Sequence, residues 1–114
     1  MKIFLKVAGL NFSPAKDNLE LTIKEHLAKV STGEESNIEV FLEPEPENRY
    51  DPKAVLVTMN GLKVGYVSKD CHYMVHHPVQ LIERKQAFIE SWGKQVDKDS
   101  KREYMYCTLF ITRS

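Results

Sequence analysis

The chain has little cysteine, no surplus of charge of either sign and no long hydrophobic run. Among its 114 residues are two cysteines, Cys71 and Cys107, too few for a disulfide framework. Lysine plus arginine and aspartate plus glutamate both total 16, so any nucleic-acid binding must come from a local patch. No segment is long enough to span a membrane, and Lys6 interrupts an N-terminus already too short for a signal peptide. We therefore expect a cytoplasmic protein with reduced thiols and no membrane contact.

Signatures of catalysis and of cofactor binding are also missing. There is no glycine-rich phosphate cradle, no Rossmann pattern and no evident set of metal-binding carboxylates. His72 and His76 have helical i, i+4 spacing and lie beside Cys71 and His77, but without a second ligand pair this cluster matches structural zinc spacing poorly. The cysteines also lack an evident context for a nucleophile. We expect no cofactor, no metal and no enzyme; a small hydrolase using residues 71–77 is the third hypothesis.

The N-terminal part of the chain predicts one strand and one helix. Residues 2–8 alternate charged and apolar side chains, as a half-buried strand does. Ser13 as N-cap and Pro14 at the first helical position predict a helix over residues 14–31, which Gly33 ends. The apolar residues of this segment recur at helical spacing: Leu19, Ile23, Leu27 and Val30.

The remainder predicts short strands separated by turns. Strands are expected over residues 38–42, 53–59, 62–67, 79–93 and 102–112. We expect an acidic turn over residues 43–51 and a hairpin turn at Asn60-Gly61, with positive φ at both positions. A short helix is expected over residues 68–76, and a mobile loop over the charged residues 94–101. About six strands with one or two inserted helices indicate a mainly β fold, a small open barrel or curled sheet, as one domain over residues 1–114.

The most informative stretch runs from Glu43 to Val67, with the sequence EPEPENRYDPKAVLV and, two residues on, NGLKVGYV. An apolar strand ends there in a turn rich in proline and glutamate. This turn displays Asn48, Tyr50 and Asp51, three side chains able to hydrogen-bond or to stack.

These residues resemble the HIRAN domain, whose pattern runs E-P-x-N-x-Y-D-x-x-A-I/V-x-V and then G-x-x-V-G-Y/H. Residues 7–12, VAGLNF, are similar to its first strand, V-x-G-(L/V/T)-x-(F/Y). The correspondence covers residues 3–12 and 38–70. The resemblance implies an OB-like β-barrel of about six strands. Larger family members attach this domain to helicase or nuclease domains, whereas a chain of this length is expected to be a stand-alone module.

The resemblance further implies binding of single-stranded DNA at a free 3′ end. In DNA-binding members, aromatic rings grip the terminal nucleotide and an aspartate contacts the 3′-hydroxyl; the matching positions are Phe12, Tyr50 and Asp51, with Asn48 and Lys69 beside them. Physically, rings stack on any base for roughly 1 to 3 kcal/mol each, and a carboxylate accepts from a hydroxyl but repels a phosphate. The full set of candidate DNA-binding residues is Phe12, Asn48, Tyr50, Asp51, Lys63, Tyr66, Lys69 and Tyr104.

Several of these residues have an equally good structural explanation. The rings of Phe12, Tyr104 and Tyr106 would also fill the core of a small barrel. Asn48 would also stabilise its own turn by bonding to the backbone, rather than donating to phosphate. Lys63 and Lys69 are placed in the set as cations for backbone phosphates.

Three departures from the family pattern favour a different function. Asn11 stands where a DNA-binding relative has arginine, and the glutamates of the turn create a negative field. Residues 13–36 form a long insertion whose helix is placed to reshape or cover the pocket. The alternative is thus a non-catalytic protein-interaction module that keeps the barrel but has lost DNA binding. Under the first hypothesis the partners are single-stranded DNA with a free 3′ end and a separately encoded helicase or nuclease, in DNA repair.

Overall fold

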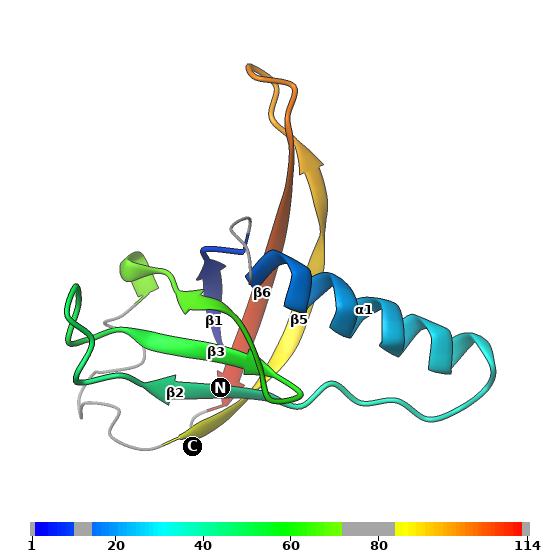
Figure 1. The fold of residues 1–114 in the computed structure, drawn as a ribbon, viewed down its shortest axis with the longest axis horizontal. Coiled ribbons are helices and arrows are strands. Elements are labelled where there is room, and N and C mark those ends of the chain that lie inside the picture. The colour runs from blue at the N-terminus through cyan, green and yellow to red at the C-terminus, as the bar shows by residue number, and fades with distance from the viewer. Residues whose placement is uncertain (1, 11–14, 72–83, 113–114) are drawn as a thin grey trace.

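The computed structural model describes residues 2–10, 15–71 and 84–112. Its elements are β1 (Lys2–Ala8), α1 (Ala15–Ser31), β2 (Val40–Pro44), β3 (Val55–Met59), β4 (Leu62–Val67), the 3₁₀ turn η1 (Lys69–Cys71), β5 (Lys85–Val96) and β6 (Glu103–Thr112). The strands form a closed antiparallel barrel in the order β1-β4-β3-β2-β5-β6, with β6 returning to β1 (Figure 1). The predicted mainly β, OB-like barrel is confirmed, and it is closed rather than open.

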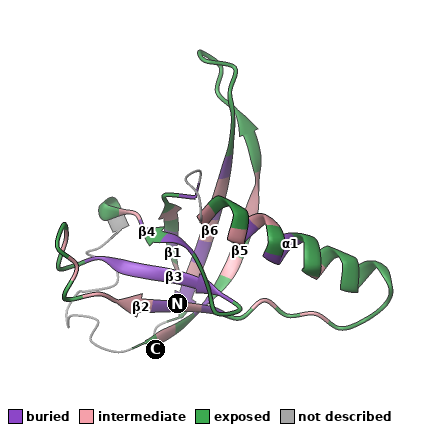
Figure 2. Ribbon diagram, viewed as in Figure 1, coloured by how far each residue is buried: buried purple, intermediate pink, exposed green. Residues whose placement is uncertain are grey.

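The barrel interior is aliphatic. Along β6 the odd-numbered positions point inward, and Met105, Cys107, Leu109 and Ile111 are all buried. Every residue of β3 is buried, so both faces of this strand are covered (Figure 2). Tyr104 and Tyr106 occupy the outward positions of β6, so neither ring fills the core.

Strand β4 is fixed at both of its ends, and its second end carries the site. At the predicted hairpin, Asn60 and Gly61 have φ of 51° and 84°, as the turn requires, and Asn60 Oδ1 accepts from the Glu39 backbone N–H at 2.9 Å. The barrel then closes through a short pairing of β1 with β4, Val7 opposite Val67 and Ala8 opposite Tyr66. A bulge in β4 precedes this contact. The bulge lies opposite the step from Val57 to Thr58 in the paired strand β3.

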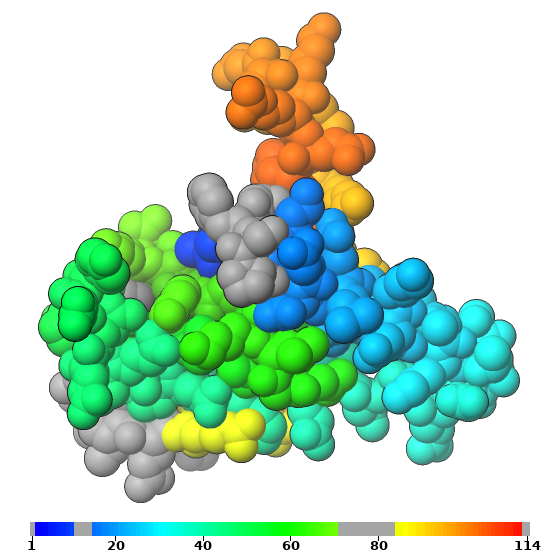
Figure 3. Space-filling view, viewed as in Figure 1, coloured from blue at the N-terminus to red at the C-terminus, as the bar shows by residue number. Residues whose placement is uncertain are grey.

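Helix α1 packs on the barrel only through its first half. Leu19 and Ile23 are buried, whereas Leu27 and Val30, next on the same stripe, are half exposed because the helix extends beyond the barrel (Figure 3). Gly33 at φ 82° ends the helix as predicted. The predicted cap, Ser13-Pro14, lies outside the described residues. Among the described residues, no helix combines the length and apolar character needed to cross a membrane.

Several predicted strand boundaries are wrong by a few residues. Strand β2 begins at Val40 and extends over the first residues of the acidic turn, because Glu43 and Pro44 still pair with β3. Strand β3 begins only at Val55, because the Ala54 N–H donates to the Asp51 carbonyl within the turn. Pairing thus decides these boundaries, and local composition does not.

The C-terminal hairpin differs more. Strand β5 runs to Val96 because its last residues pair with β6, so the first three residues of the predicted loop are strand. The remaining turn is held by Asp97, whose carboxylate accepts from the Asp99 N–H at 2.8 Å, and its mobility stays a prediction. The helix predicted over 68–76 is η1 as far as Cys71, and residues 72–83, including the start of the predicted 79–93 strand, lie outside the described part.

Candidate functional site

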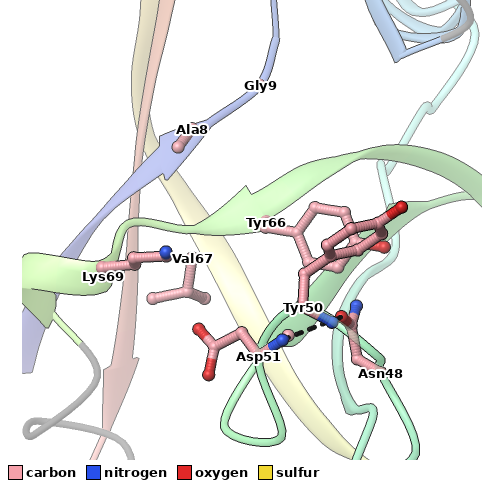
Figure 4. A pocket seen from close by; sticks show the side chains of 9 residues that line it. Ala8, Gly9, Asn48, Tyr50, Asp51, Tyr66, Val67 and Lys69 are labelled. Carbon is pink, nitrogen blue, oxygen red and sulfur yellow. Dashed lines mark hydrogen bonds between the residues drawn. The ribbon is translucent and has the colours of Figure 1, made fainter.

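A cavity of about 380 Å³ opens where the ends of β1 and β4 meet the turn that joins β2 to β3. Its wall is apolar at the base and polar at the rim (Figure 4). The lining residues are Ala8, Gly9, Asn48, Tyr50, Asp51, Ala54, Tyr66, Val67 and Lys69. Five of the eight predicted DNA-binding residues therefore come together around one pocket: Asn48, Tyr50, Asp51, Tyr66 and Lys69.

Asn48 organises the rim of this pocket. Its Oδ1 accepts from the backbone N–H of Tyr50 at 2.9 Å and of Asp51 at 3.1 Å, while its Nδ2 donates to the Glu45 carboxylate at 3.1 Å. Two backbone donors on Oδ1 also settle the orientation of the amide. Asn48 thus does the turn-stabilising work that was one of its two predicted roles, and it sets the positions of both neighbouring site residues.

Replacing Asn48 by alanine is expected to loosen this turn and to lower the free energy of unfolding by about 1 to 2 kcal/mol, because two backbone donors lose their acceptor. Aspartate at the same position keeps the acceptor but faces the Glu45 carboxylate. Asn48→Asp should therefore be more stable than Asn48→Ala at low pH, and this difference in stability should shrink at neutral pH, where the two carboxylates repel each other. Urea unfolding of the three proteins at both pH values measures this. Equal stability of Asn48→Ala and wild type would contradict the assigned role.

Tyr66 is held in place by the acidic turn. Burial, with a hydrogen bond to Glu45 and the negative charge of that carboxylate, raises the pKa of Tyr66 above its ordinary value of 10.0. Glu45 therefore positions both Tyr66 and Asn48, a role that the sequence analysis missed because the contact joins the turn to a separate strand. Glu43 pairs with Arg84 at 3.2 Å, so two of the three glutamates in the turn have internal partners.

Tyr50 and Lys69 are exposed at the rim, and Asp51 is partly buried. Tyr50 is 95% exposed, so its ring is not needed for packing. Asp51 Oδ1 accepts from the Lys53 backbone N–H at 2.9 Å, which fixes the side chain against the turn. In the view of Figure 4 the two tyrosine rings lie together on one side, with Asp51 and Lys69 on the other and Val67 between them. The pocket thus combines aromatic surface, one carboxylate and one ammonium group.

The other predicted site residues lie elsewhere. Lys63 is exposed near the β3–β4 turn, where its carbonyl accepts from Asn18 of α1 at 2.8 Å. Tyr104 lies far along the β5–β6 hairpin and donates to Gln95 at 2.7 Å. Neither residue lines the pocket. Phe12 lies outside the described residues.

The inserted helix does not cover the pocket. No residue of α1 is part of its lining, and the helix instead extends away from that side of the barrel (Figure 1). Residues 15–31 therefore leave the mouth open.

The structure adds little support to a catalytic or metal site. Burial raises the pKa of Cys107 to about 12, which makes its thiol a poor nucleophile at neutral pH. Within the described residues no group of three or more histidine, cysteine, aspartate or glutamate side chains is arranged to hold a metal ion. His72, His76 and His77 lie outside those residues, so the hypotheses built on them stay predictions.

Comparison with known proteins identifies one family. The sequence model of the HIRAN domain matches residues 2–112, nearly the whole chain. No curated protein and no solved structure matches it significantly. HIRAN domains are DNA-binding and not catalytic domains, so the match supports a nucleic-acid-binding module. The chain belongs to the HIRAN domain family.

Proposed function

We propose that this pocket binds the terminal nucleotide of single-stranded DNA at a free 3′-OH end. The observation that carries the proposal is the fully exposed ring of Tyr50 beside the anchored ring of Tyr66, on the rim of a cavity with an apolar base. An exposed ring held on a hydrogen-bonded turn has no packing role, and a base provides the flat partner that such a ring binds.

Charge at the rim supplies the end preference. Asp51 is placed to accept a hydrogen bond from a hydroxyl and would repel a phosphate at the same position. Lys69, which lies across the pocket from the two tyrosine rings in Figure 4, is suited to the phosphate that precedes the terminal nucleotide. The acidic turn opposes DNA less than its composition indicates, because the charge of Glu43 is paired with Arg84.

A linear and a circular single strand of the same length and composition test this proposal. The linear strand should compete with a labelled oligonucleotide for the protein, whereas the circle has no end and should compete at least about tenfold less well. The two strands carry the same phosphates and bases, so nonspecific electrostatic binding would treat them alike. Equal competition by the circle would contradict end recognition. In this function the module serves DNA repair or processing, alongside a separately encoded helicase or nuclease.

A protein-interaction module is the second candidate, and one observation favours it. A groove of about 510 Å³ lies between the middle of α1 and the β5–β6 hairpin; Ile23, Leu27, Trp92 and Met105 line it together with Glu20, Lys24, Gly93 and Lys94. Figure 3 shows the helix and the hairpin projecting from the barrel in different directions. Such a groove suits an apolar partner better than a polyanion.

Salt separates the two functions. Phosphate contacts make DNA affinity fall steeply with ionic strength, whereas an apolar protein interface changes little. Leu27→Asp, placed in the groove and away from the pocket, should leave DNA binding intact under the first function.

A further inference from the structure

Three phenylalanines, Phe4, Phe88 and Phe110, lie on the outside of the barrel. Phe4 of β1 and Phe88 of β5 are 50% and 42% exposed, and Phe110 of β6 lies between them. The Phe88 and Phe110 rings stack at 5.3 Å between centroids, and Phe4 meets Phe110 edge-on at 6.4 Å. Three rings thus form a continuous, partly exposed aromatic surface, here called the outer aromatic band.

Cations interleave with these rings. The Lys2 ammonium group lies 4.4 Å from the centroid of the Phe110 ring, and Lys6 is exposed two positions beyond Phe4 on the same strand face. From residue 104 to residue 112 the outward positions of β6 carry no carboxylate, and neither do those of β1. The nearest acidic residue on β5 is Glu90, which is exposed at a bulge beyond Phe88. Rings and lysines in alternation fit a polyanion that has flat bases better than they fit an apolar protein surface.

The band is continuous with the pocket. Side chains on one face of a strand are two residues apart, so Lys2, Phe4, Lys6 and Ala8 share the outward face of β1. Ala8 is part of the pocket lining. Four residues of extended chain span roughly 13 Å, so Phe4 lies only a few nucleotides from the pocket.

We propose that the nucleotides on the 5′ side of the bound end run along the outward face of β1 and stack on the outer aromatic band, with Lys6 and Lys2 facing the backbone phosphates. The inference rests on the proposed function, because the strand's 3′ end occupies the pocket. It defines the ligand as a single strand of several nucleotides, since a base-paired flank has no free faces to stack. It also explains why a protein with no net charge carries exposed lysines between exposed rings on this face.

Oligo-dT of three and of twelve nucleotides, both with a free 3′-OH, tests the proposal by fluorescence anisotropy. Wild type should bind the longer strand at least about tenfold more tightly. Phe4→Ala should reduce affinity for the twelve-mer by roughly 5- to 50-fold and leave the trimer unchanged, while Phe4→Tyr, which keeps a ring, should bind both strands as wild type does. Lys6→Gln should reduce the salt dependence of twelve-mer binding by about one phosphate contact. Tyr104→Ala is the matched control, because it removes an exposed ring from β6 at the far end of the hairpin.

Each remaining outcome is decisive. Equal wild-type affinity for the two lengths, or unchanged twelve-mer binding by Phe4→Ala, would overturn the band as a DNA contact while leaving the pocket in place. Equal losses for trimer and twelve-mer in Phe4→Ala would show a structural role only, and this too would overturn the proposal. Self-association of wild type that Phe4→Ala abolishes would assign the band to a protein contact instead. Failure of wild type to bind either strand would refute the proposed function itself.

Discussion

Gly65→Ala is expected to lower the free energy of unfolding by about 3 kcal/mol or more. A Cβ at this position would lie 2.5 Å from the Ala8 carbonyl oxygen and 3.0 Å from the Val7 side chain. Gly65 also has a φ of 147°, which side chains disfavour. The clash falls on the short β1–β4 pairing that closes the barrel, so the pocket should be lost with the stability.

Gly61→Ala is the matched control for this prediction. Gly61 has a φ of 84°, and a Cβ there would have no atom within 4 Å. The same substitution should therefore cost only about 1 to 2 kcal/mol, the strain of a left-handed backbone. Chemical denaturation of both variants measures the difference, and similar stabilities for the two would show that the close approach of β1 to β4 is unimportant.

Asp51→Asn is expected to remove the preference for a free 3′-OH over a 3′-phosphate. The amide keeps an oxygen that can accept from Lys53 and from a hydroxyl, so affinity for the 3′-OH strand should fall only about 5- to 10-fold. Affinity for the 3′-phosphate strand should rise, because the repelling charge is gone. The ratio of the two affinities, measured by anisotropy at fixed salt, should approach one.

Glu47→Gln controls for the general field of the acidic turn. Glu47 lies in the same turn and is exposed, but it does not line the pocket. Its neutralisation removes the same charge as Asp51→Asn and should raise the affinity for both strands alike. An equal loss of end preference in Glu47→Gln would contradict a specific contact at Asp51.

Much of the barrel is predictable from local pattern. Residues 2–8 and 62–67 form strands as the alternation predicts, and Asn60-Gly61 forms the hairpin turn because both positions accept positive φ. The ends of β2 and β5 were misplaced, because a strand continues for as long as its neighbour pairs with it. Glu43 and Pro44, read as turn by composition, are strand for this reason.

The site was predictable where one segment builds it and less so where two segments meet. Asn48, Tyr50 and Asp51 share a turn whose chemistry is legible in the sequence. The hydrogen bond from Tyr66 to Glu45 joins that turn to β4, and no local pattern indicates it. Tyr104 illustrates a second limit. Alternation shows that Tyr104 shares a face of its strand with Phe110, but it does not show that Tyr104 lies far along the hairpin from the pocket.

The inward face of the barrel was ambiguous for the same reason. In β6 one set of alternating residues includes Tyr104, Tyr106 and Phe110, and the other is Met105, Cys107, Leu109 and Ile111, so either set has enough apolar side chains for a core. Only closure of the six strands decides between them, because a small interior accepts aliphatic side chains on every strand. The aromatic residues are thereby left outside, where they are available to bind.

The most direct test of the account is wild-type binding of labelled oligo-dT with a free 3′-OH against the same strand with a 3′-phosphate, by fluorescence anisotropy at low and moderate salt. We predict at least about tenfold tighter binding of the free 3′-OH strand at low salt, and a smaller ratio at moderate salt because salt screens the repulsion between Asp51 and the 3′-phosphate. Equal affinity for the two strands, or no binding of either, would contradict recognition of the DNA end by the Tyr50 and Asp51 pocket.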